Sequence, residues 1–252
     1  MKRLPKYLAS TVMLLSPLAA HSADIAPKAP LLPIPVFSWT GFYVGANIGG
    51  AWVNNNWTDS LFAINNNTNN NGVFIGGGQI GGNYEIGNFV IGGEWDFDGA
   101  ANNNNNNVAI NPGFAVTSNN RWITTVAARF GYTVFDQGLV YGKAGGGWVG
   151  NNNLTVTNLA TAVSLTCNAS TNCGSSSAGW LLGVGFEYAL TNNWTVKLEY
   201  DFLGLGSRTF VIPHTAPILA GDTITSNNRN VQTVKVGFNY LFNWGAPVAA
   251  RY

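Results

Sequence analysis

Charged side chains are scarce in this 252-residue sequence: Asp, Glu, Lys and Arg together make up only 9% of it. An ordinary soluble domain carries roughly 25%. The formal net charge of +1 gives no electrostatic reason to expect a nucleic acid or an acidic substrate as partner. Because 46% of the residues are hydrophobic, the composition also excludes an intrinsically disordered chain.

Long apolar runs are missing as well. No run reaches the roughly 18 residues that a transmembrane helix needs. Only helices and closed barrels span a bilayer, because lipid offers no partner for an unpaired backbone group. If the chain crosses a membrane, the sequence therefore predicts that it does so as a closed β-barrel.

The first residues have the pattern of an export signal. A basic start, MKRLPK, precedes the apolar run YLASTVMLLSPLAA and a zone of small residues suited to cleavage. Cleavage after Ser22 predicts a signal peptide at 1–22, and Pro17 argues against the alternative of a short buried helix. Residues 23–38 contain four prolines and are predicted to form an extended tether to a folded domain at 39–252.

Cysteine and histidine are nearly absent. The two cysteines, Cys167 and Cys173, lie in the segment CNASTNC, and a zinc site would need further ligands. After export to an oxidising compartment they are predicted to form a local disulfide, with two free thiols as the alternative. His214, the only histidine of the mature chain, is predicted to be a solvated loop residue, since a triad or metal site needs positioned partners. The sequence predicts no catalytic residue, cofactor or metal site.

Glycine and aromatic residues are abundant instead, with 31 glycines and 13% aromatics. Bulky residues alternate with small or polar ones, as in WTVKLEYDF at 194–202, and this period of two is typical of β-strands. Eight such segments are predicted to be strands, at about 40–52, 73–86, 89–98, 121–133, 139–148, 178–190, 194–203 and 231–242.

Short and long connections between these segments alternate strictly. Three are tight turns, one of them at Gly87-Asn88, where glycine and asparagine accept a positive φ. The four long connections lie at 53–72, 99–120, 149–177 and 204–230. The first three contain runs of asparagine, which predict solvated, flexible loop tips. Outer-membrane barrels sort their connections in this way, with short periplasmic turns and long external loops. The predicted fold is an all-β, eight-stranded antiparallel up-and-down transmembrane β-barrel.

The two faces of the predicted strands differ in side-chain size and polarity. The bulky face is predicted to meet lipid, and its representatives are Val44, Ile91, Val126, Leu182, Val184, Leu198 and Val236. The other face is mostly small or polar and carries charges of both signs, at Glu85, Glu94, Asp96, Arg129, Lys143, Glu187, Lys197, Glu199 and Lys235. Eight strands enclose a space that side chains can fill, so these charges are predicted to pair as a structural plug. An ion path along the same residues is the alternative.

Several motifs also resemble those of one protein family. They include WTGFYVGANIGGAW after the proline-rich stretch, RFGY at 129–132, YGKAGG at 141–146 and VGFNYLF at 236–242. These motifs are similar to those of the opacity-like, porin-superfamily outer-membrane proteins, often labelled outer membrane immunogenic proteins. The resemblance covers the signal and the whole barrel, and it implies an outer-membrane barrel with surface-exposed loops.

The predicted function is structural and interactive: an integral protein of the cell outer membrane that stabilises the envelope and presents an antigen- or adhesion-type surface. Its predicted partners are outer-membrane lipid and lipopolysaccharide, the barrel assembly machinery and, through the loops, host, phage or carbohydrate. A small ion or solute pore is the first alternative. A soluble lipocalin-like binder or a barrel enzyme is the second.

Overall fold

A computed structural model describes residues 37–59, 65–69, 72–101, 107–111, 114–135, 137–158, 160, 162, 164–167, 177–211 and 223–242. By its internal contacts the chain divides into Met1–Pro33 and Ile34–Tyr252, and all described residues belong to the second unit. The predicted signal peptide, and the predicted tether as far as residue 36, lie outside the described residues. In the described part of the chain, no helix has the length and apolar character needed to cross a membrane.

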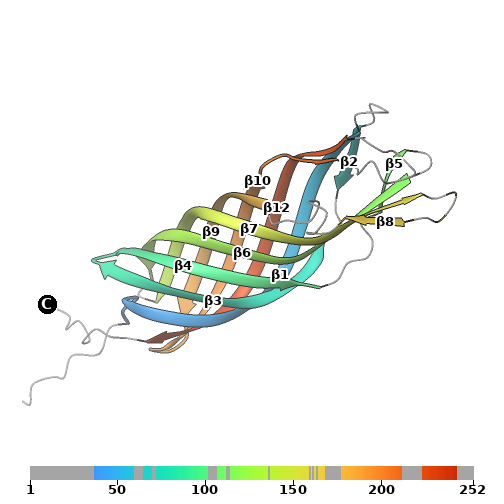
Figure 1. The fold of residues 1–252 in the computed structure, drawn as a ribbon. Coiled ribbons are helices and arrows are strands. Elements are labelled where there is room, and N and C mark those ends of the chain that lie inside the picture. Colours follow the sequence, from blue (N-terminus) through green and yellow to red (C-terminus); the bar gives the residue numbers. More distant parts are fainter. Residues whose placement is uncertain are drawn as a thin grey trace, which may run out of the picture. The chain divides into compact units, whose positions relative to one another are not determined.

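Eight long strands form a closed barrel (Figure 1). They are β1 (Gly41–Asp59), β3 (Val73–Ile86), β4 (Phe89–Ala100), β6 (Phe114–Val134), β7 (Gly138–Asn158), β9 (Ser177–Ala189), β10 (Trp194–Leu205) and β12 (Thr223–Phe242). Neighbouring strands are antiparallel and follow the order of the chain, and β1 pairs with β12 to close the cylinder. The predicted eight-stranded antiparallel up-and-down barrel is confirmed.

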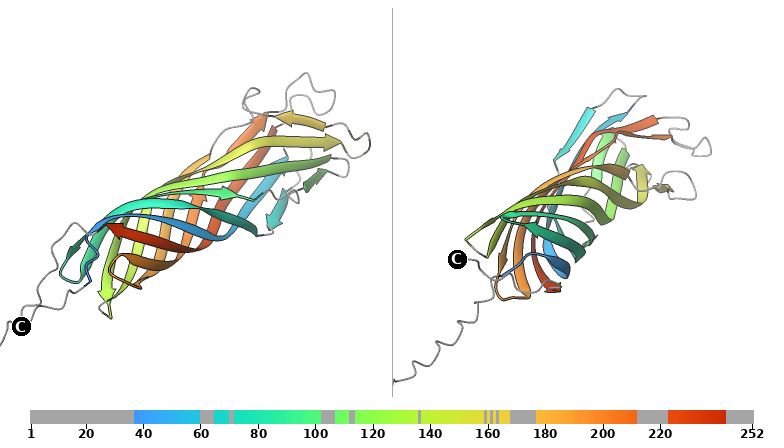
Figure 2. Two further views of the ribbon diagram at one scale, coloured as in Figure 1. Left: turned by 90° about the horizontal axis from the view of Figure 1, so that it is seen from below. Right: turned by 90° about the vertical axis from the view of Figure 1, so that its left-hand side faces the viewer.

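The strand ladder continues further toward the long connections than the alternation predicts. Four short strands pair with the outer ends of long ones: β2 (Asn65–Asn69) with β1, β5 (Asn107–Asn111) with β6, β8 (Ser164–Cys167) with β7 and β11 (Arg208–Val211) with β12. Figure 2 shows these hairpins together at one end of the barrel. The alternation does not predict them because each is only four or five residues long, and the asparagine-rich β2 has no bulky face at all. The unpaired edge of each long strand still offers backbone hydrogen bonds that a neighbouring segment completes.

The short turns lie at the opposite end of the barrel, and between the two ends alternation separates the side chains. Gly87 adopts a φ of 62° in the β3–β4 turn, in agreement with the turn predicted at Gly87-Asn88. On β10, Leu198 is 55% exposed on the outside, whereas Lys197 beside it is 1% exposed inside the barrel. The polar face of the strands therefore looks inward, and the candidate site lies inside the barrel.

Candidate functional site

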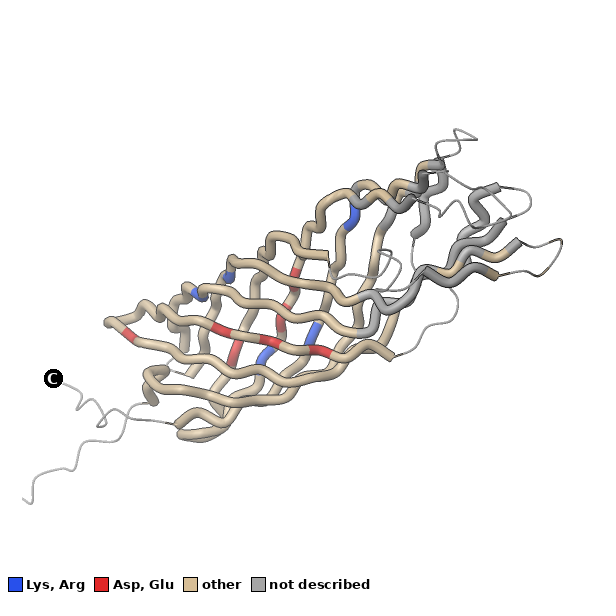
Figure 3. The backbone as a smooth tube through the Cα atoms, viewed as in Figure 1, with Lys and Arg blue, Asp and Glu red and all other residues tan. Residues whose placement is uncertain are grey.

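Ten charged side chains meet inside the barrel, and Figure 3 shows acidic and basic positions on neighbouring strands. They are Glu94, Asp96 and Asp98 of β4, Arg129 of β6, Lys143 of β7, Glu187 of β9, Lys197, Glu199 and Asp201 of β10, and Lys235 of β12. None of these ten is more than 4% exposed. We call them the interior network. The sequence prediction contains eight of them and omits Asp98 and Asp201, although the same period of two marks both as inward residues.

Glu94 lies at the centre of the interior network. Its Oε2 is 2.9 Å from Lys197 Nζ and 3.4 Å from Arg129 Nη1, and its Oε1 is 3.3 Å from Lys143 Nζ. The Tyr43 hydroxyl donates a hydrogen bond of 2.8 Å to the same Oε2. A buried carboxylate needs both opposite charge and hydrogen-bond donors, and Glu94 has both.

Two lysines each reach four carboxylates. Lys143 Nζ lies within 3.3 Å of carboxylate oxygens of Glu94, Asp96, Glu199 and Asp201. Lys235 Nζ lies within 3.5 Å of carboxylate oxygens of Asp96, Asp98, Glu199 and Asp201. Because the two lysines share three of these partners, the contacts form one connected cluster and not a set of separate pairs.

Arg129 extends the network toward the short turns. Its Nη2 donates a hydrogen bond of 2.7 Å to Glu187, and its Nη1 donates to the Tyr43 hydroxyl. The guanidinium carbon lies 3.9 Å from the centre of the Tyr141 ring, a cation–π contact, and the Tyr141 hydroxyl donates to Glu199 over 2.7 Å. The sequence prediction includes neither tyrosine, although each occupies an inward position by alternation.

Apolar side chains lie on both sides of the interior network. Toward the long connections the buried cluster consists of Ala51, Val53, Ile75, Ile123, Ala127, Val149, Leu181, Leu203, Leu205 and Val231. Toward the short turns it consists of Trp39, Val90, Leu139 and Tyr141. The network therefore lies in a region of low dielectric constant, where an ion pair is strong and an unpaired charge is costly.

Residues 37–39, which we call the N-terminal plug, lie at the short-turn end of the barrel, with the Trp39 side chain inside it. Trp39 is 1% exposed, and its ring packs edge-to-face against Phe37 with centroids 4.9 Å apart. Glu85 Oε2 accepts hydrogen bonds of 3.0 Å from Ser38 Oγ and from the backbone N of Trp39. Glu85 therefore binds the plug and lies apart from the interior network to which the sequence prediction assigns it. The reason is its position at the end of β3, next to the short turn.

Inward glycines make room for the long side chains of the network. A Cβ atom added at Gly183 would lie 2.2 Å from Asp201 Oδ1 and 2.9 Å from Lys143 Cγ. At Gly185 it would lie 2.4 Å from the Tyr141 ring. Such distances are shorter than van der Waals contact, so a side chain at either position requires the network to shift.

Gly183→Ala is expected to lower the free energy of unfolding by about 1–3 kcal/mol, because the added methyl group overpacks the interior against Asp201 and Lys143. The matched control is Gly142→Ala, where the nearest atom to the added Cβ is a backbone oxygen at 3.8 Å. Urea unfolding of the two variants in lipid vesicles measures the difference. Equal stability of the two variants would contradict the close packing described at Gly183.

Three carboxylates of the network have a spacing that could suit a metal ion. One oxygen each from Glu94, Asp96 and Glu199 lies within 4.8 Å of the others. Lys143 Nζ, however, lies within 3.3 Å of all three side chains and already compensates their charge. A cation placed there would also be repelled by the ammonium group. We assign these three residues to the ion-pair cluster.

The sequence of the chain matches the family model of the outer membrane protein beta-barrel domain over residues 11–242. The chain belongs to this family of outer-membrane β-barrels. It is 33% identical over 241 residues to the 31 kDa outer-membrane immunogenic protein of Brucella melitensis biotype 1, with 89% of this chain and 94% of that protein covered. The protein of the same name from Brucella suis biovar 1 gives the same values. The resemblance seen in the sequence motifs is thereby confirmed.

Solved outer-membrane proteins are also similar to this chain. The outer membrane protein OprG from Pseudomonas aeruginosa has a TM-score of 0.47 at 10% identity, over 83% of this chain and 100% of that one. Ail, the attachment invasion locus protein of Yersinia pestis, has a TM-score of 0.42 at 13% identity, over 81% of this chain and 99% of that one.

An outer-membrane β-barrel has its outer surface in the bilayer, and the large side chains of this barrel lie on that surface. The seven residues that the sequence predicts to meet lipid are all 42–61% exposed there: Val44, Ile91, Val126, Leu182, Val184, Leu198 and Val236. Trp52 and Trp148 lie on the same surface toward the long connections, and Trp194 lies toward the short turns. This is the arrangement of aromatic girdles at the two interfaces of such barrels.

Leu198→Arg is expected to reduce the free energy of folding into bilayers by about 2–4 kcal/mol, because it exposes a charge to hydrocarbon midway along β10. The control is Leu190→Arg, at an outward residue of the β9–β10 turn that is 53% exposed. Near the interface the same charge should cost only about 0–1 kcal/mol. Unfolding by urea in vesicles compares the two. A cost at position 190 as large as at 198 would mean that β10 does not cross the bilayer in the orientation described.

Two residues singled out in the sequence, Cys173 and His214, lie outside the described residues. Of Cys167, the structure describes only the backbone, at the end of β8. The disulfide between Cys167 and Cys173 and the solvated position of His214 therefore stay predictions.

Proposed function

We propose that this protein stabilises the outer membrane as a barrel with a sealed interior and that its long connections form a contact surface on the outside of the cell. The observation that carries the proposal is the burial of the interior network between two apolar clusters. Its ion pairs join strands that are not neighbours in the barrel, as Lys197 of β10 reaches Glu94 of β4. Ion pairs across the interior oppose separation of the strands and so stabilise the closed barrel, as a structural protein of the envelope requires.

The same burial argues against the alternative of an ion or solute pore. A water-filled pore would keep its charges separately hydrated, whereas here ammonium and carboxylate groups lie in contact and out of reach of solvent. A substrate could not approach these groups either, and so our proposal includes no enzymatic activity.

The proposal includes a route to the membrane and a set of partners. The basic and apolar start of the sequence supports export with cleavage of a signal peptide at 1–22. Insertion by the barrel assembly machinery and contact with lipopolysaccharide follow from an outer-membrane location. The Brucella relatives are named as immunogenic proteins, which supports an antigen- or adhesion-type surface facing host, phage or carbohydrate.

Planar-bilayer recording of the purified monomer tests the sealed interior. The expected result is no steady, large conductance, because the paired charges and both apolar clusters exclude a continuous water column. Steady single-channel currents whose size changes in Lys143→Gln would overturn the proposal and establish the pore alternative.

Replacement of one long connection tests the contact surface. Cells that display wild-type protein are compared with cells that display a variant whose residues 168–176 are replaced by a glycine–serine segment of equal length. Heat-dependent gel mobility confirms that both barrels are folded. Binding of antibodies raised against intact cells is expected to fall in the variant, as is adhesion to host cells. If replacement of each long connection in turn leaves both unchanged, the interactive part of the proposal is wrong.

A further inference from the structure

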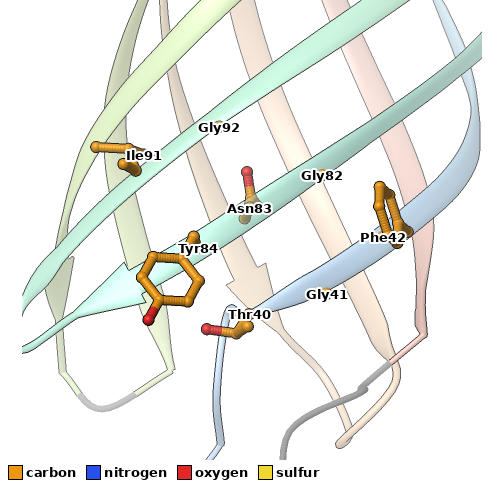
Figure 4. Close-up of a pocket in the computed structure, with 8 residues that line it drawn as sticks. All are labelled: Thr40, Gly41, Phe42, Gly82, Asn83, Tyr84, Ile91 and Gly92. Carbon is orange, nitrogen blue, oxygen red and sulfur yellow. The ribbon is translucent and has the colours of Figure 1, made fainter.

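A groove lies on the outer surface of the barrel near the short turns (Figure 4). Its volume is about 580 Å³, and it is lined by Thr40, which directly precedes β1, and by residues of β1, β3 and β4. None of the described residues that line it is charged. Volume and apolar character are those of a small-molecule site, although the groove is open along the barrel wall.

Missing side chains create this groove. Gly82 of β3 points outward and pairs with Gly93 of β4, so neither strand contributes a side chain at that level. The neighbouring outward pairs along the same two strands are large: Ile80 with Trp95 on one side, and Tyr84 with Ile91 on the other. Gly82 therefore leaves a gap beside Tyr84 and Ile91, and all three residues line the groove.

Two aromatic rings border the gap. Phe42 of β1 pairs with Gly82, and a Cβ added at Gly82 would lie 3.0 Å from the Phe42 ring. Phe42 is 60% exposed and Tyr84 is 58% exposed, and Figure 4 shows their rings on either side of the glycine. The hydroxyl groups of Tyr84 and Thr40 lie at the same end of the groove, toward the short turns.

We propose that this groove holds one acyl chain of a phospholipid in the periplasmic leaflet of the outer membrane. The proposal rests on the outer-membrane location of the barrel. The groove is continuous with the lipid-facing surface, and it lies at the end with short turns, which such barrels direct to the periplasm. The side chains that line this groove lose dispersion contacts unless an acyl chain fills it.

Shape complementarity provides the affinity. The surrounding bilayer is as apolar as the groove, so an acyl chain gains nothing from leaving water and is retained through van der Waals fit, as helices in membranes are. The hydroxyls of Tyr84 and Thr40 mark the end at which the polar part of the lipid would lie, since amphipathic side chains gather at the headgroup level.

A second copy of the barrel fits the groove less well than a lipid chain does. The sheet is closed by the β1–β12 pairing and offers no free strand edge for another barrel to extend. Two barrels would meet only along their convex walls, whereas an acyl chain is narrow and flexible enough to enter a gap between side-chain rows.

Photo-cross-linking tests the proposal. The full-length protein is folded into vesicles that contain a phosphatidylethanolamine with a diazirine in its acyl chain, and cross-linked peptides are located by mass spectrometry. Wild-type protein is expected to show cross-links concentrated on the segment around Phe42 and on the segment around Gly82. In Gly82→Leu, whose new side chain fills the groove, these cross-links are expected to fall severalfold.

Gly78→Leu is the matched control, because Gly78 lies on the same face of β3 and does not line the groove. It should retain the wild-type pattern. Cross-links spread evenly around the barrel, or a pattern unchanged in Gly82→Leu, would overturn the proposal, as would a protein–protein cross-link through the groove that excludes lipid. Heat-dependent gel mobility checks that each variant is folded in the membrane, so a failed lipid site is distinguishable from a failed outer-membrane assignment.

Discussion

Arg129→Met is expected to lower the free energy of unfolding by about 3–5 kcal/mol, because it removes one partner of a buried ion pair and leaves the other unpaired. The carboxylate that loses its cation is that of Glu187, whose Oε2 lies 2.7 Å from Arg129 Nη2. Glu94 loses one cation but keeps Lys143 and Lys197. Urea or guanidinium unfolding in lipid vesicles measures the loss.

The double variant Arg129→Met with Glu187→Gln separates loss of the pair from loss of packing. Because it removes one charge of each sign, the balance of the interior network is unchanged, and the double variant should be more stable than Arg129→Met alone. If the loss of unfolding free energy in the double variant equals the sum of the losses caused by each substitution alone, the two side chains do not act as a pair. The interior network would then contribute far less to stability than its geometry indicates.

Trp39→Ala is expected to lower the free energy of unfolding by about 3–5 kcal/mol as well, because it removes a buried ring and leaves a cavity at the short-turn end. It should also admit water to the interior, so hydrogen exchange in β4 and β9 should accelerate relative to wild type. Unfolding in vesicles and hydrogen–deuterium exchange read by mass spectrometry measure the two effects.

Trp148→Ala is the control for Trp39→Ala, since the Trp148 side chain is 40% exposed on the outer surface. Its loss should leave exchange in the interior strands unchanged. If Trp39→Ala exchanges no faster than Trp148→Ala in those strands, the N-terminal plug does not seal the barrel. The sealed interior would then depend on the apolar cluster toward the long connections alone.

The alternation of side chains along single segments was sufficient to predict the barrel, because it shows which face of each strand is apolar. Successive residues of a strand point to opposite faces, so a run such as WTVKLEYDF carries its own orientation without reference to any other segment. The same reason explains why Lys197 and Leu198 could be assigned to opposite faces. The sorting of connections by length added the order of the strands, since a tight turn forces its two strands to be neighbours.

The strand extensions and the N-terminal plug were not predictable in this way. β2, β5, β8 and β11 are only four or five residues long, too short for alternation to predict them, and they are strands because longer strands pair with them. Trp39 precedes the first strand and has no repeating pattern around it. Its burial depends on the mouth of a barrel that exists only once β1 and β12 have paired.

By itself, the sequence determined the fold class, the outward and inward faces and most members of the interior network, because each follows from spacing along one strand. Only the tertiary structure decided which charges meet. Lys197 reaches Glu94 from the other side of the interior, whereas Glu85, an equally inward acid, binds the plug at the mouth. The physical reason is that strand periodicity fixes the direction of a side chain, while its partner depends on closure and register. Those are properties of all eight strands together.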